Sequence, residues 1–221
     1  MLTLFITTLV LTIGVQMWLR NTYGRWERVA NTSGLTGADT ARAILRANGL
    51  DDVKVESVPG QLTDHYDPRT KTVRLSEAHF RVPSVAGAAV AAHEVGHALQ
   101  HAKAYGPLQM RAALVPIANI GSNFGPWIVI GGFMLGAAGL IQVGIVLFGA
   151  AVLFQLVTLP VEFDASRRAV GEMERLGLAT SADVGGSRQV LNAAAMTYVA
   201  AAAASLMYLL HYVMMFAGSR D

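Results

Sequence analysis

The segment His93-Glu94-Val95-Gly96-His97 has the residue types and the spacing of a metal-dependent hydrolytic site. On a helix, residues four apart share one face with Cβ atoms about 5–6 Å apart, so His93 and His97 can bind one cation. Glu94 is rotated about 100° from His93 and lies beside that cation without filling its coordination shell. A carboxylate in this place can act as general base for a water that zinc has made acidic. The motif predicts a zinc hydrolase with Glu94 as catalytic base. The alternative is a small-residue helix with two hydrogen-bonded histidines and a solvated glutamate.

A catalytic zinc needs a third protein ligand, which the two histidines do not supply. The metzincin class has a histidine six residues after His97, and Lys103 at that position excludes the class. His101 lies one turn beyond His97, and a straight helix does not easily bring three consecutive turns to one tetrahedral ion. Carboxylates on a later helix are better candidates. Glu162 and Asp164 are the acids at the end of the long apolar region, and either suits the pattern.

The elements that position these residues include segments that cross a membrane. The chain is 53% hydrophobic and only 14% charged over 221 residues, too apolar for an ordinary soluble domain. Three runs contain no charged residue: the one before Arg20, the one between Arg111 and Glu162, and the one between Arg188 and Arg220. Uncharged runs of this length are typical of membrane spans. The net charge of +2 is small and arginines flank the apolar runs, which indicates membrane orientation rather than nucleic-acid binding. The absence of cysteine excludes disulfides and thiolate metal ligands.

These runs divide the chain into five parts. We expect residues 1–20 to form a retained membrane anchor, 21–111 a cytoplasmic α+β domain with the metal motif, 112–159 a transmembrane helical hairpin, 160–187 a cytoplasmic helix with the third zinc ligand, and 188–221 the last membrane helix. The predicted fold class is a multi-pass α-helical membrane protein of about four spans with a small α+β, zincin-like metalloprotease domain. By the positive-inside rule, the arginines that follow the first span place the metal site on the cytoplasmic face: Arg20, Arg25 and Arg28.

Local patterns predict the elements around the motif. Thr36, with Asp39 three residues on, forms a capping box at the start of a helix. Alternating valines predict a strand within residues 51–60, and residues 62–76 have the pattern of a β-hairpin. An open edge of this hairpin can pair with an extended substrate, or the hairpin can simply cover the metal helix. Pro160 predicts the first turn of a separate helix.

Four strings of the sequence carry a resemblance to a known family: GLTGADTARAILRANGL, LTDHYDPRTKTVRLS, AAHEVGHALQH and LPVEFDASRRA. Through them, over residues 33–169, the chain resembles the YugP-type neutral zinc metallopeptidases of bacterial membranes, gluzincin-like proteins with an HExxH motif. More distantly, it is similar to the HtpX-type membrane proteases and the CAAX-prenyl proteases. The resemblance implies a membrane endopeptidase with one Zn²⁺ per chain.

The resemblance also implies a ligand set of His93, His97 and a glutamate. In the distant relatives this glutamate begins an E-F-x-A-D string, which corresponds to Glu162 here. Their aspartate one turn later can orient a zinc-bound histidine, whereas this chain has Ser166 there and Asp164 on another face of the helix. A serine can accept a hydrogen bond from an imidazole but adds no charge. Ser166 and Asp164 are therefore candidates for residues that surround the ligands.

Other polar side chains are candidates for further roles. His65 and Tyr66 on the predicted hairpin could stabilise the oxyanion of the attacked carbonyl, and so could Arg168 with the arginine before it. The alternatives are a solvated turn histidine and arginines that contact lipid headgroups. His79 is expected at the surface, and His211, within the last span, is expected to be neutral and to face another helix.

The predicted function is zinc-dependent hydrolysis of peptide bonds in membrane-associated or juxtamembrane substrates at the cell membrane. The expected partners are the lipid bilayer and a peptide or membrane-protein substrate, with no nucleic acid. One alternative is a non-catalytic membrane scaffold or adaptor with a structural zinc site, against which Glu94 argues because such a site needs no acid there. A metal transporter would need acids or histidines within the spans, where the sequence has only His211.

Overall fold

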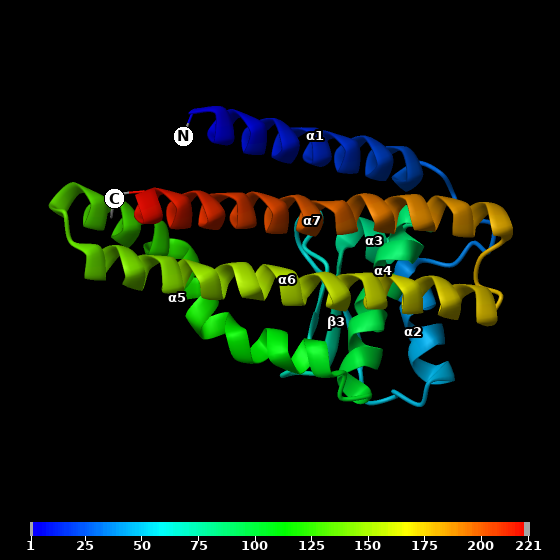
Figure 1. Ribbon diagram of the computed structural model, residues 1–221. Helices are drawn as coiled ribbons and strands as arrows, with labels where there is room; N and C mark the ends of the chain where they lie inside the picture. Colours follow the sequence, from blue (N-terminus) through cyan, green and yellow to red (C-terminus); the bar gives the residue numbers. More distant parts are fainter. Residues whose placement is uncertain (1, 219–221) are drawn as a thin grey trace. The chain divides into compact units, whose positions relative to one another are not determined.

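The computed structural model describes residues 2–218, and in this part of the chain helices predominate over strands. The elements are α1 (Leu2–Glu27), α2 (Gly37–Ala47), β1 (Lys54–Val58), β2 (His65–Asp67), β3 (Thr72–Ser76), α3 (Glu77–Arg81), α4 (Val85–Ala102), α5 (Gly106–Leu135), α6 (Ala138–Arg175) and α7 (Ser181–Gly218) (Figure 1). Among the described helices, α1, α5, α6 and α7 are long and apolar enough to cross a membrane. The predicted fold class is confirmed: a multi-pass helical membrane protein with a small α+β domain.

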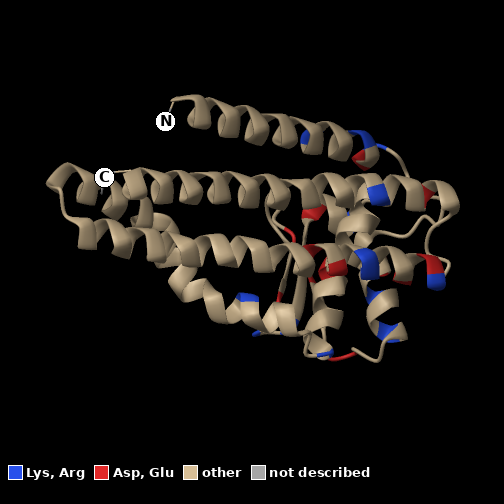
Figure 2. Cartoon of the chain, viewed as in Figure 1, with Lys and Arg blue, Asp and Glu red and all other residues tan. Residues whose placement is uncertain are grey.

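The described chain forms two compact units. The first comprises residues 2–14, 106–160 and 197–218, and the second comprises residues 15–105 and 161–196. Helices α1, α6 and α7 therefore contribute one part to each unit. Charged residues gather on the elements of the second unit, whereas the apolar lengths of these three helices carry none (Figure 2).

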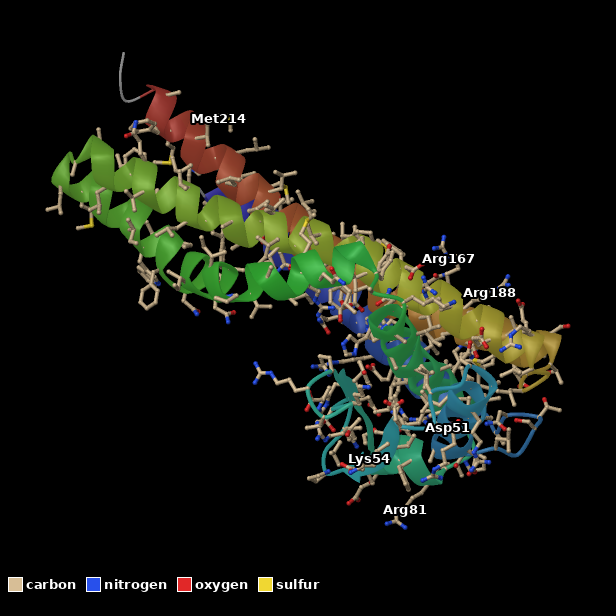
Figure 3. All side chains as sticks on the ribbon, turned by 90° about the horizontal axis from the view of Figure 1, so that it is seen from below. Asp51, Lys54, Arg81, Arg167, Arg188 and Met214 are labelled. Atoms are coloured by element: carbon tan, nitrogen blue, oxygen red, sulfur yellow. The ribbon has the colours of Figure 1, made fainter. Side chains whose placement is uncertain are left out.

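In the first unit, α5 and α6 form a close helical hairpin. The chain reverses at Gly136, whose φ of +65° lies in the left-handed region that glycine adopts without strain. Where the helices cross, a Cβ at Gly121 would lie 1.9 Å from the carbonyl oxygen of Leu147, so only glycine permits this approach. Large apolar side chains are exposed on this unit, among them Trp127 on α5, as expected of helices that contact lipid. Met214 on α7 is exposed in the same way (Figure 3).

The second unit is built on a mixed three-stranded sheet with the order β1-β3-β2. β2 and β3 pair antiparallel, which confirms the predicted hairpin, and β1 pairs parallel with β3. The predicted capping box is also present, since the Thr36 hydroxyl accepts from the backbone N–H of Asp39 and the Asp39 carboxylate accepts from that of Thr36. Buried apolar side chains join α2, the sheet, α4 and α6 in one core: Ile44, Leu45, Val73, Leu75, Val95, Leu99 and Met173.

The prediction that Pro160 opens a separate helix is wrong. α6 continues through Pro160 without interruption and carries Glu162 in its later part. A proline inside a helix removes one backbone hydrogen bond, a loss that membrane helices tolerate when neighbouring groups satisfy the freed carbonyl. One helix therefore contains both the apolar span and the acids that follow it.

The expectation that His79 lies at the surface is also wrong, because His79 is fully buried. Its Nδ1 lies 2.9 Å from a carboxylate oxygen of Asp64 and 3.0 Å from the hydroxyl of Ser76. Its Nε2 lies 2.6 Å from the hydroxyl of Tyr23 on α1, which is also 3.0 Å from Glu27. His79 lies one helical turn after Ser76, on the short helix α3. Nothing in this local sequence indicated that α1 would cover the ring. The ring joins α1 to the α+β elements through buried hydrogen bonds.

We expect His79→Leu to lower the free energy of unfolding by about 2–4 kcal/mol, because Asp64 and Tyr23 would lose a buried partner. Thermal unfolding of the detergent-solubilised protein measures this. His65→Leu, at an exposed histidine on β2, is the matched control and should stay within about 0.5 kcal/mol of wild type. Equal unfolding midpoints for the two variants would contradict a stabilising role for the His79 network.

Candidate active site

The candidate site lies where α4 meets the later part of α6. Ser84 caps α4 by accepting from the backbone N–H of Gly87, and the helix is buried along most of its length. Gly96 is the point of closest approach, since a Cβ there would lie 2.5 Å from the carbonyl oxygen of Ala165. A mid-helix glycine costs about 1 kcal/mol relative to alanine, and the close crossing with α6 is the physical reason for one here.

The crossing brings His93, His97 and Glu162 together. One ligand atom from each lies within 4.8 Å of the others. The Nε2 atoms of His93 and His97 are 3.3 and 3.7 Å from the same oxygen of Glu162, and the two rings lie edge to face. Two imidazole nitrogens and one carboxylate oxygen therefore converge on one point from two helices.

The arrangement suits a zinc ion with one open coordination position. Ligand bonds of about 2.0–2.1 Å in tetrahedral geometry separate neighbouring ligand atoms by about 3.3 Å, close to the 3.3 and 3.7 Å between the Glu162 oxygen and the two Nε2 atoms. The side chain of Glu162 is 3% exposed, whereas those of His93 and His97 are 14% and 13% exposed. Glu162 is thus the most deeply buried of the three, and three protein ligands leave one position of a tetrahedral shell open, as a catalytic zinc site requires.

The Nδ1 atoms of both histidines meet polar groups outside the cluster. Ser166 Oγ lies 3.1 Å from Nδ1 of His93, and Gln100 Oε1 lies 3.0 Å from Nδ1 of His97. The Gln100 amide nitrogen in turn donates to Asp164 at 3.0 Å. With Nδ1 engaged in this way, Nε2 of each ring is left to bind a cation.

Sequence reasoning missed Gln100. Its one local signal is its place three residues after His97, which puts a polar side chain on the face of the helix that carries the two histidines. The partners that give this side chain its role lie on α6, more than sixty residues away in sequence.

Glu94 is 9% exposed, and its negative charge acts on His97. Burial alone would lower the pKa of His97, but the attraction of Glu162 and Glu94 outweighs burial, and the net shift is upward. Because a protonated imidazole cannot bind a metal, cation binding at this cluster is coupled to proton loss from His97. The arrangement provides ligands for a cation and a carboxylate beside them.

Comparison with known proteins agrees with this geometry. Residues 1–217 match the family described as "Putative neutral zinc metallopeptidase". The chain is 47% identical over 222 residues to the "Putative membrane protease YugP" of Bacillus subtilis (strain 168), a match that covers 99% of each chain. The chain belongs to this family. The resemblance seen in the sequence is thereby confirmed, and no solved structure matches the chain significantly.

The candidates on the hairpin have partners of their own. The hydroxyl of Tyr66 lies 2.9 Å from Nδ1 of His101, and Nδ1 of His65 lies 2.8 Å from the backbone oxygen of Thr63. His101 therefore pairs with β2 and is not among the three residues that cluster in the described part of the chain. Transition-state contacts by His65 and Tyr66 remain predictions.

The two arginines bind an acid of their own helix. Arg167, whose side chain extends outward from α6 (Figure 3), donates to one oxygen of Asp164, and Arg168 Nε donates to the other at 2.5 Å. The Arg168 guanidinium also lies over the ring of Tyr105, with 5.8 Å to its centroid. In the last helix, Nε2 of His211 is buried without a hydrogen-bond partner among the described residues.

We expect Glu162→Ala to abolish tight zinc binding, because two protein ligands hold the ion weakly. Zinc content after dialysis, measured by elemental analysis of the purified protein, tests this. Asp164→Ala removes an acid two residues away and should still bind one ion per chain at saturating zinc. Glu172→Ala, which breaks an ion pair with Arg175 on the same helix, is the control for general damage to α6 and should bind zinc as wild type does. Equal zinc loss in the Glu162 and Asp164 variants would show that the two acids share the site.

Proposed function

We propose that the protein is a zinc-dependent membrane endopeptidase with His93, His97 and Glu162 as ligands and Glu94 as general base. The observation that carries the proposal is the convergence of two Nε2 atoms and one carboxylate oxygen at the spacing of a tetrahedral zinc shell. Membership of a family described as zinc metallopeptidases supports it.

The residues of the chain divide the chemistry among them. Bound zinc would supply a Lewis acid that polarises the scissile carbonyl and makes water acidic near neutral pH. The carboxylate of Glu94 accepts the proton of the attacking water and can return it to the leaving amine nitrogen. Because Glu94 is nearly buried, few water molecules surround its carboxylate, and its charge acts strongly on the groups beside it.

A zinc ion that only stabilised the fold would have a different environment. Structural zinc sites are closed by four protein ligands, whereas this cluster has three among the described residues and two partly exposed histidines. A structural site also has no use for a carboxylate placed beside its ligands. These features favour a catalytic site over a scaffold or adaptor.

We also propose that substrates bind in extended form along β2. This strand is an edge of the sheet and pairs only with β3 among the described strands. Tyr66 on β2 contacts His101, which follows His97 by one turn on α4, so the edge lies close to the helix that carries both histidines. A peptide that adds to this edge gains backbone hydrogen bonds whatever its sequence. Membrane-associated or juxtamembrane segments are the substrates that a membrane-bound protease meets.

The active site is proposed to face the cytoplasm. Arg20, Arg25 and Arg28 occur at the end of α1 and directly after it, where positive charge marks the cytoplasmic end of a membrane helix. The turn between α5 and α6 carries no charged residue, as expected of a loop on the opposite side. The hairpin would then return to the cytoplasmic side and bring Glu162 to the histidines.

We expect Glu94→Gln to keep zinc but to lower the rate of casein hydrolysis by about 10²–10⁴-fold, because an amide cannot accept the proton. Zinc content and turnover of the purified protein are the two measurements. Glu77→Gln, at an exposed glutamate on α3, should leave both unchanged. Near wild-type turnover by the Glu94 variant would remove Glu94 as the base, and an inactive wild type that binds zinc would favour a scaffold.

Membrane orientation can be tested by single-cysteine labelling, since the native chain has no cysteine. Thr70→Cys, in the exposed turn between β2 and β3, should resist an impermeant maleimide until intact cells are opened. Ala138→Cys, at the exposed start of α6, should react at once. The reverse pattern would place the site outside and overturn the proposed substrates.

A further inference from the structure

Gln100 is a fully buried side chain that connects three polar groups. Its Nε2 donates to the backbone oxygen of Val161 at 2.8 Å and to the carboxylate of Asp164 at 3.0 Å. Its Oε1 lies 3.0 Å from Nδ1 of His97. One amide thus links a histidine on α4 to two consecutive turns of α6.

The partners fix which way the amide points. A backbone carbonyl and a carboxylate can only accept, so both must face the amide nitrogen. Asp164 is a carboxylate here because Arg167 and Arg168 both donate to it. The amide oxygen must then face His97, and an oxygen can only accept. The proton of a neutral His97 therefore lies on Nδ1, and the lone pair lies on Nε2, the atom nearer Glu162.

We propose that Gln100 is the positioning residue of the metal centre, and this rests on the proposed zinc function. Gln100 holds His97 in the tautomer and ring orientation that bind a cation through Nε2. Because the same amide binds the carbonyl of Val161, directly before Glu162 in the chain, it also fixes α4 against the turn of α6 that carries the third ligand. Asp164, held by its two arginines, anchors the amide and does not touch the ion.

The two histidines differ in this respect. Nδ1 of His93 meets the hydroxyl of Ser166 at 3.1 Å, and a hydroxyl can donate or accept. Ser166 therefore does not dictate the tautomer of His93, whereas Gln100 dictates that of His97. Loss of Gln100 should accordingly weaken cation binding more than loss of Ser166.

The first test compares Gln100→Leu with Ser166→Ala and Asn48→Leu by zinc affinity, measured by competition with a chromogenic chelator. Asn48 is the matched control because its amide also bonds a backbone carbonyl, that of Ile44, and an α6 carboxylate, that of Glu172, away from the histidines. Gln100→Leu should bind zinc about 10–100-fold more weakly, and Asn48→Leu should bind as wild type. Thermal unfolding of the zinc-free proteins reports any general loss of stability. Equal affinity losses for Gln100→Leu and Asn48→Leu, or none for Gln100→Leu, would overturn the proposal.

A second test reverses the polarity of the contact and does not depend on the leucine variant folding. Gln100→Glu places a second carboxylate against Asp164 and should weaken zinc binding. The new oxygen also faces the backbone carbonyl of Val161, so an acceptor replaces the donor at both contacts. Glutamate and glutamine have nearly the same size and shape, so a space-filling role predicts unchanged zinc affinity, whereas the proposal predicts a loss of at least about 10-fold and a changed visible spectrum of the cobalt-substituted form. Unchanged affinity and spectrum in Gln100→Glu would show that Gln100 acts as a space-filling residue.

The outcomes separate this proposal from the proposed function. A wild-type protein that binds no zinc would rule out both the proposed function and the role of Gln100. A wild-type protein that binds one zinc and loses turnover in Glu94→Gln, with affinity unchanged in Gln100→Leu, removes only the role of Gln100.

Discussion

The close crossing of α4 and α6 is the constraint on which the candidate site depends. Gly96 lets the backbone of α6 approach so near that any side chain at this position would collide with Ala165. The two histidines flank this glycine in sequence, and Glu162 precedes Ala165 by three residues, so the contact point is also the centre of the donor set. A wider crossing would leave the same residues present and too far apart to bind one ion.

Buried polar groups give the crossing its specificity. An unpaired donor or acceptor in this region costs about 1–3 kcal/mol, and more if charged, so each group selects an arrangement in which its partner is present. Gln100 and Asp164 meet this demand between α4 and α6, as His79, Asp64 and Tyr23 do between α3, the sheet and α1. The polar contacts therefore fix how each helix is positioned along its neighbour, which apolar packing alone leaves less defined.

The ring orientation and tautomer of the two histidines are constrained to different degrees. Gln100 presents an acceptor to His97, and Ser166 presents a hydroxyl of either polarity to His93. In the proposed zinc site, His97 would be the more rigidly held ligand and His93 the more adaptable one.

Much of this protein could be predicted from the sequence where the signal is local. The uncharged runs predicted four apolar helices, the turn residues within residues 62–76 predicted the hairpin, and Thr36 with Asp39 predicted the start of α2. The spacing of His93, Glu94 and His97 is a property of one helix, and therefore the sequence alone predicted a metal motif. Hydropathy and helical periodicity depend on residues within a few turns of one another, and these features could therefore be predicted from the sequence.

Other features depended on contacts between elements far apart in the chain. Continuation of α6 through Pro160, burial of His79 beneath α1, the parallel pairing of β1 with β3 and the contact between Gln100 and Asp164 were decided by tertiary structure. The family resemblance pointed to Glu162 rather than Asp164 as the third ligand, but only the phase of α6 against α4 turned Glu162 toward the imidazoles and Asp164 toward the amide of Gln100. A side chain's role in a buried site is set by the partner opposite it, and that partner is chosen by packing rather than by neighbours in the chain.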